Sequence, residues 1–337
     1  MSCYHPMRAI KTFNPEHLFN QDVPEFTYRV LKGSYDPDEE CKVPNSKYIP
    51  LPCGRCIGCR LDYSRTWADR CMLEASYHTD NIFLTLTYND ECLPKPLEGS
   101  KIHPLVKRDV QLFIKRLRRV TGQKIRYFAA GEYSPAMRPH YHLIIFGLRL
   151  EDLKIHHKDM QNGFTYYVSP TIDHCWYPEE DDKKMAADRR ISGFHIISNV
   201  SWDTCAYTAR YVMKKQKGKG SEIYEKYNFP PEFTLMSRRP GIANQFYVDH
   251  NDIVVKDFYM PTSKGFKKIK SNKYFDKLFD VDYPSDLEFI KEDRQRIAEA
   301  NAKMKNNLTS LSYQEQLLSD EINKEAAIKV LKRKGDF

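Results

Sequence analysis

The sequence Arg138-Pro139-His140-Tyr141-His142-Leu143-Ile144-Ile145-Phe146-Gly147 predicts a β-strand, because aromatic and β-branched residues follow a proline and end at a glycine. Side chains alternate between the two faces of a strand, so His140 and His142 should point to the same side. Two imidazoles on one face of a rigid strand suit a divalent metal. The alternative is a pair of histidines on the solvated face of an edge strand.

A second strand is predicted just upstream, from Ile125 to Glu132. If the two strands pair antiparallel across residues 133–138, Glu132 lies close to His140 and His142. Two imidazoles and one carboxylate with open positions form a usable site for Mg²⁺ or Mn²⁺.

The composition favours a folded protein with an anionic partner. The chain has 337 residues, 41% hydrophobic and 13% aromatic, enough for one large domain or two ordinary ones. The formal net charge is +8; residues 101–130 hold nine Lys or Arg against one acid, and residues 204–220 hold five and no acid. Such clusters among aromatic residues favour nucleic acid, whereas a solvated helix face would normally mix both signs.

No apolar run is long enough to predict a membrane span, and the first residues do not resemble a signal peptide. We therefore expect no membrane partner. The chain has nine cysteines, which in a reducing cytosol bind metal or are buried rather than form disulfides.

Three cysteines, Cys53, Cys56 and Cys59, follow one another at two-residue spacings. Tetrahedral Zn²⁺ needs four ligands, so a fourth must come from elsewhere, with Cys3 and Cys41 as the candidates. An iron–sulfur cluster would accept the same spacing, and reduced thiols in a loop are the alternative to any metal. A structural role is expected, because nothing beside the triad resembles an acid–base pair.

Further elements follow from periodicity. Residues 1–50 show no sustained period and are expected to be irregular, and residues 148–190 are predicted to be a charged insertion. Residues 106–120 form a basic amphipathic helix with Val110, Phe113 and Leu117 in its buried stripe. Other helices are predicted at about 59–78, 204–217, 285–305 and 312–333, and other strands at 81–88 and 193–200.

The helix predicted at 204–217 carries Tyr207 and Tyr211, four residues apart and thus on one face. Lys214 and Lys215 follow one turn later. Two tyrosines can simply anchor a helix to the core. Beside a strand with two metal-binding histidines in a basic protein, they suggest nucleophiles instead.

These residues together resemble a known family. The motifs are Phe83-Leu84-Thr85-Leu86-Thr87-Tyr88, Gly131-Glu132-Tyr133, the two-histidine strand and Tyr207-x3-Tyr211-x2-Lys214. They are similar to the HUH endonucleases, the initiators of rolling-circle replication. The stretches Pro52-Cys53-Gly54-x-Cys56-x2-Cys59 and Ser237-Arg238-Arg239-Pro240-Gly241 resemble the initiators of the Microviridae, small single-stranded DNA phages, especially the gokushovirus branch. The resemblance runs from about 52 to 247.

The resemblance implies an α+β fold: a central antiparallel sheet with flanking helices, an HUH/Rep-like nuclease core of the ferredoxin-like or RRM-like kind. It implies His140 and His142 as metal ligands, with Glu132 as the acidic third ligand. It implies Tyr207 and Tyr211 as nucleophiles, and Lys214 as the residue that contacts the scissile phosphate or activates a tyrosine. The expected organisation is an irregular segment with a Cys-rich knuckle (1–60), an HUH endonuclease domain (61–250, with the insertion) and a basic linker with C-terminal helices (251–337).

The activity implied is nicking of single-stranded origin DNA. A tyrosine hydroxyl has a pKa near 10, so a nearby cation and a metal must activate it. Attack leaves a 5′-phosphotyrosine and a free 3′-OH, and a second tyrosine can cut the regenerated origin. The chain has no P-loop motif, so a host helicase must unwind the DNA and a host polymerase extend it, in the cytoplasm of a host bacterium. The residues expected to contact DNA are Arg116, Arg118, Arg119, Arg210, Lys215, Arg238 and Arg239.

Two other functions are compatible with parts of the sequence. A non-catalytic, zinc-containing DNA-binding or packaging protein would explain the charge and the cysteines, but leaves the paired histidines and tyrosines as coincidence. A transposase or plasmid relaxase would use the same chemistry, but the Tyr-x3-Tyr spacing and the phage-like flanking motifs argue against it.

Overall fold

The computed structural model describes residues 3–20, 22–160, 163–214, 221–262 and 265–330, and within these ranges the side chains of 210–214 and 329–330 are not described. The chain divides into two compact units. The first comprises the chain up to Tyr63 and the stretch from Glu288 onward, and the second runs from Ser64 to Leu287. No helix in the described ranges is both long enough and apolar enough to cross a bilayer.

The elements of the first unit are β1 (Met7–Phe13), the 3-10 helix η1 (Pro15–Leu18), β2 (Phe26–Ser34), β3 (Ser46–Leu51) and α9 (Tyr313–Val330). Two helices cross the boundary between the units, α1 (Ile57–Ala75) and α8 (Pro284–Asn306). The strands of the second unit are β4 (Asn81–Thr87), β5 (Arg126–Tyr133), β6 (Pro139–Phe146), β7 (Lys154–Lys158), β8 (Thr165–Val168), β9 (His195–Asn199), β10 (Phe233–Met236), β11 (Phe258–Thr262) and β12 (Gly265–Ile269). Its helices are α2 (Lys107–Thr121), α3 (Pro170–Cys175), α4 (Trp202–Lys214), α5 (Glu222–Lys226), α6 (Asn244–Asp249) and α7 (Lys273–Asp282), with 3-10 helices η2 (Glu179–Asp181), η3 (Ala186–Asp188) and η5 (Asn251–Val254).

The second unit is built on a seven-stranded sheet in the order β10-β5-β6-β4-β9-β8-β7. All six pairings are antiparallel, which confirms the predicted antiparallel sheet with flanking helices. Strand β6 lies between β5 and β4, so the two histidines are not on an edge strand and that alternative is wrong. The turn at residues 134–138 sets the register that pairs Glu132 with His140.

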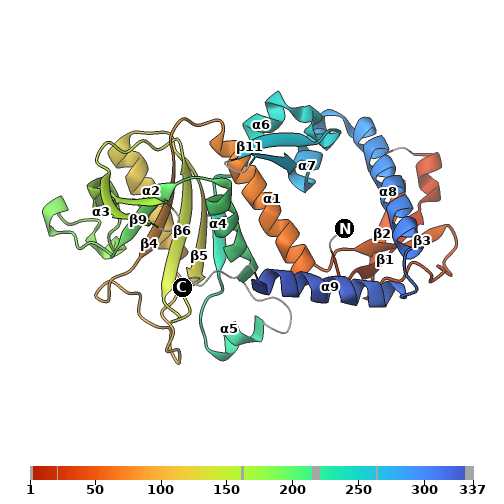
Figure 1. Ribbon diagram of the computed structural model, residues 1–337, viewed down its shortest axis with the longest axis horizontal. Coiled ribbons are helices and arrows are strands. Elements are labelled where there is room, and N and C mark those ends of the chain that lie inside the picture. The colour runs from red at the N-terminus through yellow and green to blue at the C-terminus, as the bar shows by residue number, and fades with distance from the viewer. Residues whose placement is uncertain (1–2, 21, 161–162, 215–220, 263–264, 331–337) are drawn as a thin grey trace. The chain divides into compact units, whose positions relative to one another are not determined.

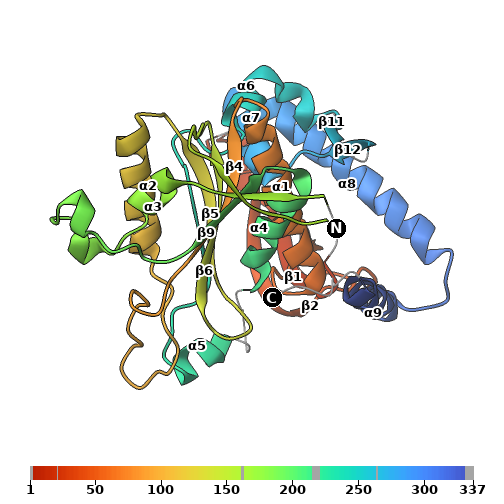
Figure 2. The ribbon, with the colours of Figure 1, turned by 60° about the vertical axis from the view of Figure 1, so that its left-hand side comes forward.

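Helices cover both faces of this sheet. Figures 1 and 2 show α2 and α3 on one side and α4, with α1, on the other. Because side chains alternate along β6, Leu143 and Ile145 pack with α2, whereas Ile144 and Phe146 pack with α1 and α4. The residues of the histidine face are therefore the even-numbered ones of this strand.

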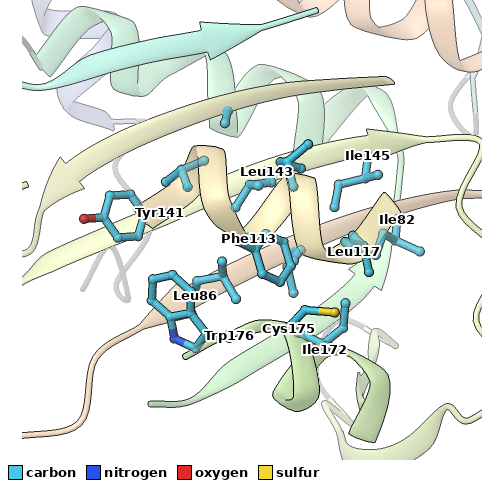
Figure 3. Close-up of a cluster of buried hydrophobic side chains, with 14 of the residues drawn as sticks. Ile82, Leu86, Phe113, Leu117, Tyr141, Leu143, Ile145, Ile172, Cys175 and Trp176 are labelled. Atoms are coloured by element: carbon cyan, nitrogen blue, oxygen red, sulfur yellow. The ribbon is translucent and has the colours of Figure 1, made fainter. Parts of the chain in front are cut away.

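The α2 side holds the larger hydrophobic cluster (Figure 3). Phe113 and Leu117 of α2 meet Leu143 of β6, and Trp176, which follows α3, closes the cluster. Burial of each such side chain stabilises the fold by about 1.5–3 kcal/mol. The predicted basic amphipathic helix is thus confirmed, and it ends where Gly122 adopts a left-handed backbone with φ of 67°.

A buried carboxylate ties α1 to the sheet. Glu74 forms an ion pair with Arg126 of β5 and accepts a hydrogen bond from the Ala243 backbone N–H at 2.7 Å. Burial alone would raise the pKa of Glu74, but the hydrogen bonds from His78 and Ala243, together with Arg126, lower it below its ordinary value. The ionised carboxylate is therefore part of what holds the α1 side of the sheet in place.

Three expectations about the flanking regions were wrong. The first fifty residues are not irregular: they form a three-stranded antiparallel sheet in the order β2-β1-β3. Residues 148–190 add β7 and β8 to the large sheet, and Ile172 and Trp176 enter its core. Residues 251–287 are not a linker, because η5, β11, β12 and α7 belong to the second unit, with Phe275 fully buried.

Most predicted elements lie within a few residues of the observed ones. The helices predicted at 59–78, 204–217, 285–305 and 312–333 correspond to α1, α4, α8 and α9. The strands predicted at 81–88 and 193–200 correspond to β4 and β9. In the first unit, α9 contacts the N-terminal sheet region through a hydrogen bond of 3.0 Å from Gln314 Nε2 to the Tyr35 carbonyl.

Candidate functional site

The first candidate site lies on the central strand β6, on the face covered by α4. His142 is buried at 5% exposure, and His140, nearer the open end of the strand, is partly exposed. Between them Tyr141 points to the opposite face, into the cluster of Figure 3. The strand therefore presents both imidazoles on one side while its other side is fixed in the core.

Glu132 joins this site from the neighbouring strand. It stands opposite His140 in the β5–β6 register, and its Oε1 lies 2.8 Å from Nε2 of His142, the diagonal neighbour. The carboxylate is 4% exposed, so this is a buried contact. The predicted proximity of Glu132 to the histidines is confirmed.

The ring of His142 is held from two further sides. Thr85 of β4 pairs with His142 in register, and its Oγ1 lies 3.0 Å from Nδ1. Phe83 stacks on the imidazole, with ring centroids 5.9 Å apart and an interplanar angle of 4°. In a neutral ring Nε2–H donates to Glu132, so Nδ1 accepts from the Thr85 hydroxyl. These contacts fix both the position and the tautomer of His142.

His140 has a defined tautomer as well. Its Nδ1 lies 2.9 Å from the carbonyl oxygen of Arg138, which can only accept, so Nδ1 carries the proton. The lone pair of the neutral ring is then on Nε2. The Arg138 guanidinium in turn donates to Asp90 at 2.7 Å and to the Tyr88 carbonyl at 2.8 Å, which holds the entry to β6.

The donor set suits a hard divalent cation. It offers two imidazole nitrogens and one buried carboxylate, and partners outside the set orient both rings, as is usual around metal-binding histidines. Among the described residues, however, only the cysteines treated below bring three or more ligand atoms within 4.8 Å of one another. His140, His142 and Glu132 are adjacent but not closed around a point.

Helix α4 brings the first predicted nucleophile to this face. It packs against β5 and β6, and the ring of Tyr207 meets His142 edge to face, with centroids 5.4 Å apart. Tyr207 also contacts Phe83 at 6.1 Å. Tyr211, Lys214 and Arg210 lie further along α4, and their side chains are outside the described part of the chain. Lys215 lies outside the described residues altogether.

The predicted DNA contacts fall into different places. Arg118 and Arg119 are exposed on α2, on the face of the sheet opposite the histidines. Arg238 and Arg239 are exposed just after β10, the strand next to β5. Arg116 does not lie on the surface, so its prediction as a DNA contact was wrong.

Arg116 is instead a bridge inside the second unit. Its side chain is 4% exposed, and it donates to Asp182 at 2.7 Å and to the Tyr177 carbonyl at 2.5 Å. Its guanidinium also lies 3.5 Å from the centre of the Tyr177 ring. All of this ties α2 to the segment around η2.

A second cluster lies in the first unit. The sulfurs of Cys3, Cys53, Cys56 and Cys59 all lie within 4.8 Å of one another, an arrangement that could hold a metal ion such as zinc. The fourth cysteine is thus Cys3 rather than Cys41. Burial alone would raise the pKa of Cys53, but the backbone N–H groups of Cys56 and Arg55 outweigh it, and the pKa is lowered.

Sequence reasoning missed Thr85 and Arg138 as parts of the site. Both belong to quoted motifs, but neither was assigned a role. The available signal was register: Thr85 lies on the strand that pairs with the histidine strand, and its face follows once that pairing is known.

Comparison with known proteins identifies the family. A family model of replication-associated proteins of the ORF2 type matches residues 81–216, the span that contains Glu132, the two histidines and the two tyrosines of α4. The chain is 32% identical over 332 residues to replication-associated protein ORF2 of Spiroplasma virus 4, covering 94% of this chain and 93% of that protein. It is 35% identical over 174 residues to replication-associated protein VP4 of Bdellovibrio phage phiMH2K (49% of this chain, 48% of that one), and 28% identical over 216 residues to replication-associated protein ORF4 of Chlamydia phage 1 (62% and 48%). No solved structure matches the chain. The chain therefore belongs to the family of phage replication-associated proteins.

Proposed function

We propose that this protein initiates rolling-circle replication by nicking single-stranded DNA at the phage origin. The observation that carries the proposal is the meeting of Tyr207 with the His142–Glu132 pair, 5.4 Å between the ring centroids of Tyr207 and His142, on the interior strand of an antiparallel sheet. Membership of the replication-associated family supports the biological context. We assign the activity to residues 61–250, as a nuclease core of the HUH type.

In the proposed reaction, a tyrosine oxygen of α4 attacks a phosphodiester phosphorus. The new bond joins tyrosine to the 5′-phosphate, the bond to the 3′-oxygen breaks, and that oxygen takes up a proton. One phosphodiester replaces another, so the step needs no ATP and can run backwards to rejoin a strand. The hydroxyl proton must leave the tyrosine, and Lys214 on the same helix is the proposed neighbouring cation.

His140, His142 and Glu132 are the proposed ligands of Mg²⁺ or Mn²⁺. Such an ion would orient the scissile phosphate and offset the negative charge that builds up on it. The residues around it have a simpler task. Thr85 and the Arg138 carbonyl hold the imidazoles in place, and Phe83 excludes water from one face of His142.

The remaining steps require partners. The 3′-OH left by cleavage would prime a host polymerase, and a host helicase would separate the strands. We place this work in the cytoplasm of the host bacterium, where both enzymes act. The exposed arginines Arg118, Arg119, Arg238 and Arg239, with Arg210 and Lys215 of the α4 region, are the proposed contacts to DNA phosphates.

The test is adduct formation with single-stranded origin DNA and Mn²⁺. Tyr207→Phe and Tyr211→Phe should each keep some single cleavage but fail to release unit-length circles in a coupled replication assay. The double variant should form no covalent adduct. The phenylalanine in Tyr207→Phe would keep the ring contacts with Phe83 and His142, so lost activity could not be ascribed to a cavity.

Tyr227→Phe, a change at an exposed tyrosine of the same unit, is the matched control and should behave as wild type. An adduct formed by the double variant would overturn the assignment of the nucleophiles. Tyr133 and Tyr141 would then be tested next, although both are buried and burial raises their pKa.

A further inference from the structure

The four cysteines of the first unit come from separate places in the chain. Cys3 precedes β1, Cys53 follows β3, Cys56 directly precedes α1 and Cys59 lies in its first turn. Their sulfurs nevertheless lie within 4.8 Å of one another. The fold has therefore brought four soft donors to one point from the beginning of a sheet, its last strand and the start of a helix.

Their spacing fits a single ion. A tetrahedron with Zn–S bonds of about 2.3 Å places its sulfurs about 3.8 Å apart. The sulfurs of Cys3 and Cys56 are 3.9 Å apart. An iron–sulfur cluster distributes its thiolates over two or more irons, so all four sulfurs could not lie this close together. The geometry thus distinguishes between the two metal centres that the sequence alone left open.

Backbone donors surround the sulfurs. N–H groups of Arg55 and Cys56 point at Cys53 Sγ at 3.4 and 3.3 Å, and that of Cys53 points at Cys3 Sγ at 3.2 Å. Those of Tyr4 and Cys59 point at Cys56 Sγ at 3.4 and 3.5 Å. Such donors stabilise negative sulfur, the form that binds metal.

The unit around this cluster has little other core. In the described residues up to Tyr63, the buried hydrophobic side chains are Ala9, Ile10 and two of the four cysteines. From Glu288 to the end of the description no hydrophobic side chain is buried. A small sheet with so little apolar burial needs another source of stability, and a structural metal is a common one.

We propose that Cys3, Cys53, Cys56 and Cys59 bind one Zn²⁺, and that the first unit depends on this ion for its fold. The ion joins the segment before β1 to the end of β3 and to the beginning of α1. Its thiolates close the coordination sphere, so the centre is structural and takes no part in DNA cleavage. The inference is independent of the proposed nuclease function.

The first test is metal analysis of the full-length protein as purified. We expect about one zinc per chain and no iron, released when a mercurial reagent blocks the thiols. Cobalt put in place of the zinc should show the absorption of a tetrahedral thiolate centre. Zinc content near zero, iron in its place, or disulfides among the four cysteines would each overturn the assignment, and none of these readouts requires a variant that folds.

The second test uses a matched pair of variants. Cys53→Ser should lose the zinc, whereas Cys41→Ser, a change at a cysteine of the same unit outside the cluster, should keep it. The dependence of the fold is tested by hydrogen exchange on the wild-type protein. Removal of zinc should speed exchange of the β1 and β3 amides by about tenfold or more, while the amides of β6 keep their protection. Unchanged exchange in β1 and β3 without zinc would refute the structural role.

Discussion

Thr85→Val should weaken binding of the catalytic cation without disturbing the fold. The Thr85 hydroxyl lies 3.0 Å from Nδ1 of His142, and its strand is paired with β6 over its whole length. A hydroxyl can accept as well as donate. It can therefore donate to Nδ1 when the ring proton is on Nε2, and accept from Nδ1–H when Nε2 ligates an ion. Valine keeps the branched shape that strands favour but can do neither.

The size of the effect follows from the role of the contact. Loss of a partner that orients a metal-binding histidine typically costs 10–100-fold in affinity, or about 1.4–2.8 kcal/mol. We expect the Kd for Mn²⁺, measured by calorimetry on zinc-loaded protein, to rise by this factor. Nicking at low Mn²⁺ should fall in proportion, and saturating Mn²⁺ should restore most of it.

Two controls separate orientation from packing. Thr85→Ser retains the hydroxyl and should keep the wild-type affinity for Mn²⁺. Thr87→Val changes the neighbouring threonine on the same face of β4, whose hydroxyl donates to the Phe194 carbonyl rather than to a histidine. Wild-type Mn²⁺ affinity in Thr85→Val, or an equal loss in Thr87→Val, would refute the reasoning.

Other variants test neighbouring parts of the argument. His140→Ala and His142→Ala should each abolish nicking, but melting followed by circular dichroism should show a loss of stability only for His142→Ala, because His142 is buried and stacked. Glu74→Gln should lower stability at pH 7 and flatten its acid dependence: the folded pKa lies below the unfolded value of about 4.3, so the carboxylate stabilises above that value and its contribution is lost as pH falls through the folded pKa, as urea unfolding at several pH values would show. Arg116→Ala should cost about 2–3 kcal/mol in unfolding free energy because it leaves Asp182 without its partner, while the Kd for single-stranded DNA stays unchanged; a weakened Kd at full stability would return Arg116 to the DNA surface.

The centre of the fold could be predicted because its signals are local. The alternation in β6, the short turn before it and the two-residue spacing of the histidines determine strand, face and register together. Glu132 follows from that register. The edge strands offered no such signal. Strand β2 is mostly exposed, so it has no apolar alternation for a periodicity argument to find.

Long-range pairing limited the rest. Arg116 lies one turn after the buried Phe113 in a helix full of basic residues, and its burial depends on Asp182, 66 positions away. In the same way, Ile172 and Trp176 are single core residues on a short helix and the loop after it. Such residues are identified by their partners, and no pattern within their own segment distinguishes them from residues of an exposed insertion.

The arrangement of β6 explains why its chemistry depends on the face that carries none. Tyr141 lies between the histidines and points the opposite way, where its hydroxyl meets that of Tyr88 at 2.9 Å and accepts the Val106 backbone N–H at 2.8 Å. A slip of one residue in register would exchange the two faces and turn Tyr141 toward α4 instead. The hydrogen bonds of Tyr141 therefore help to keep His140 and His142 on the side where Tyr207 lies. Positioning at this site is thus a property of the whole strand, shared between ligands on one face and a buried phenol on the other.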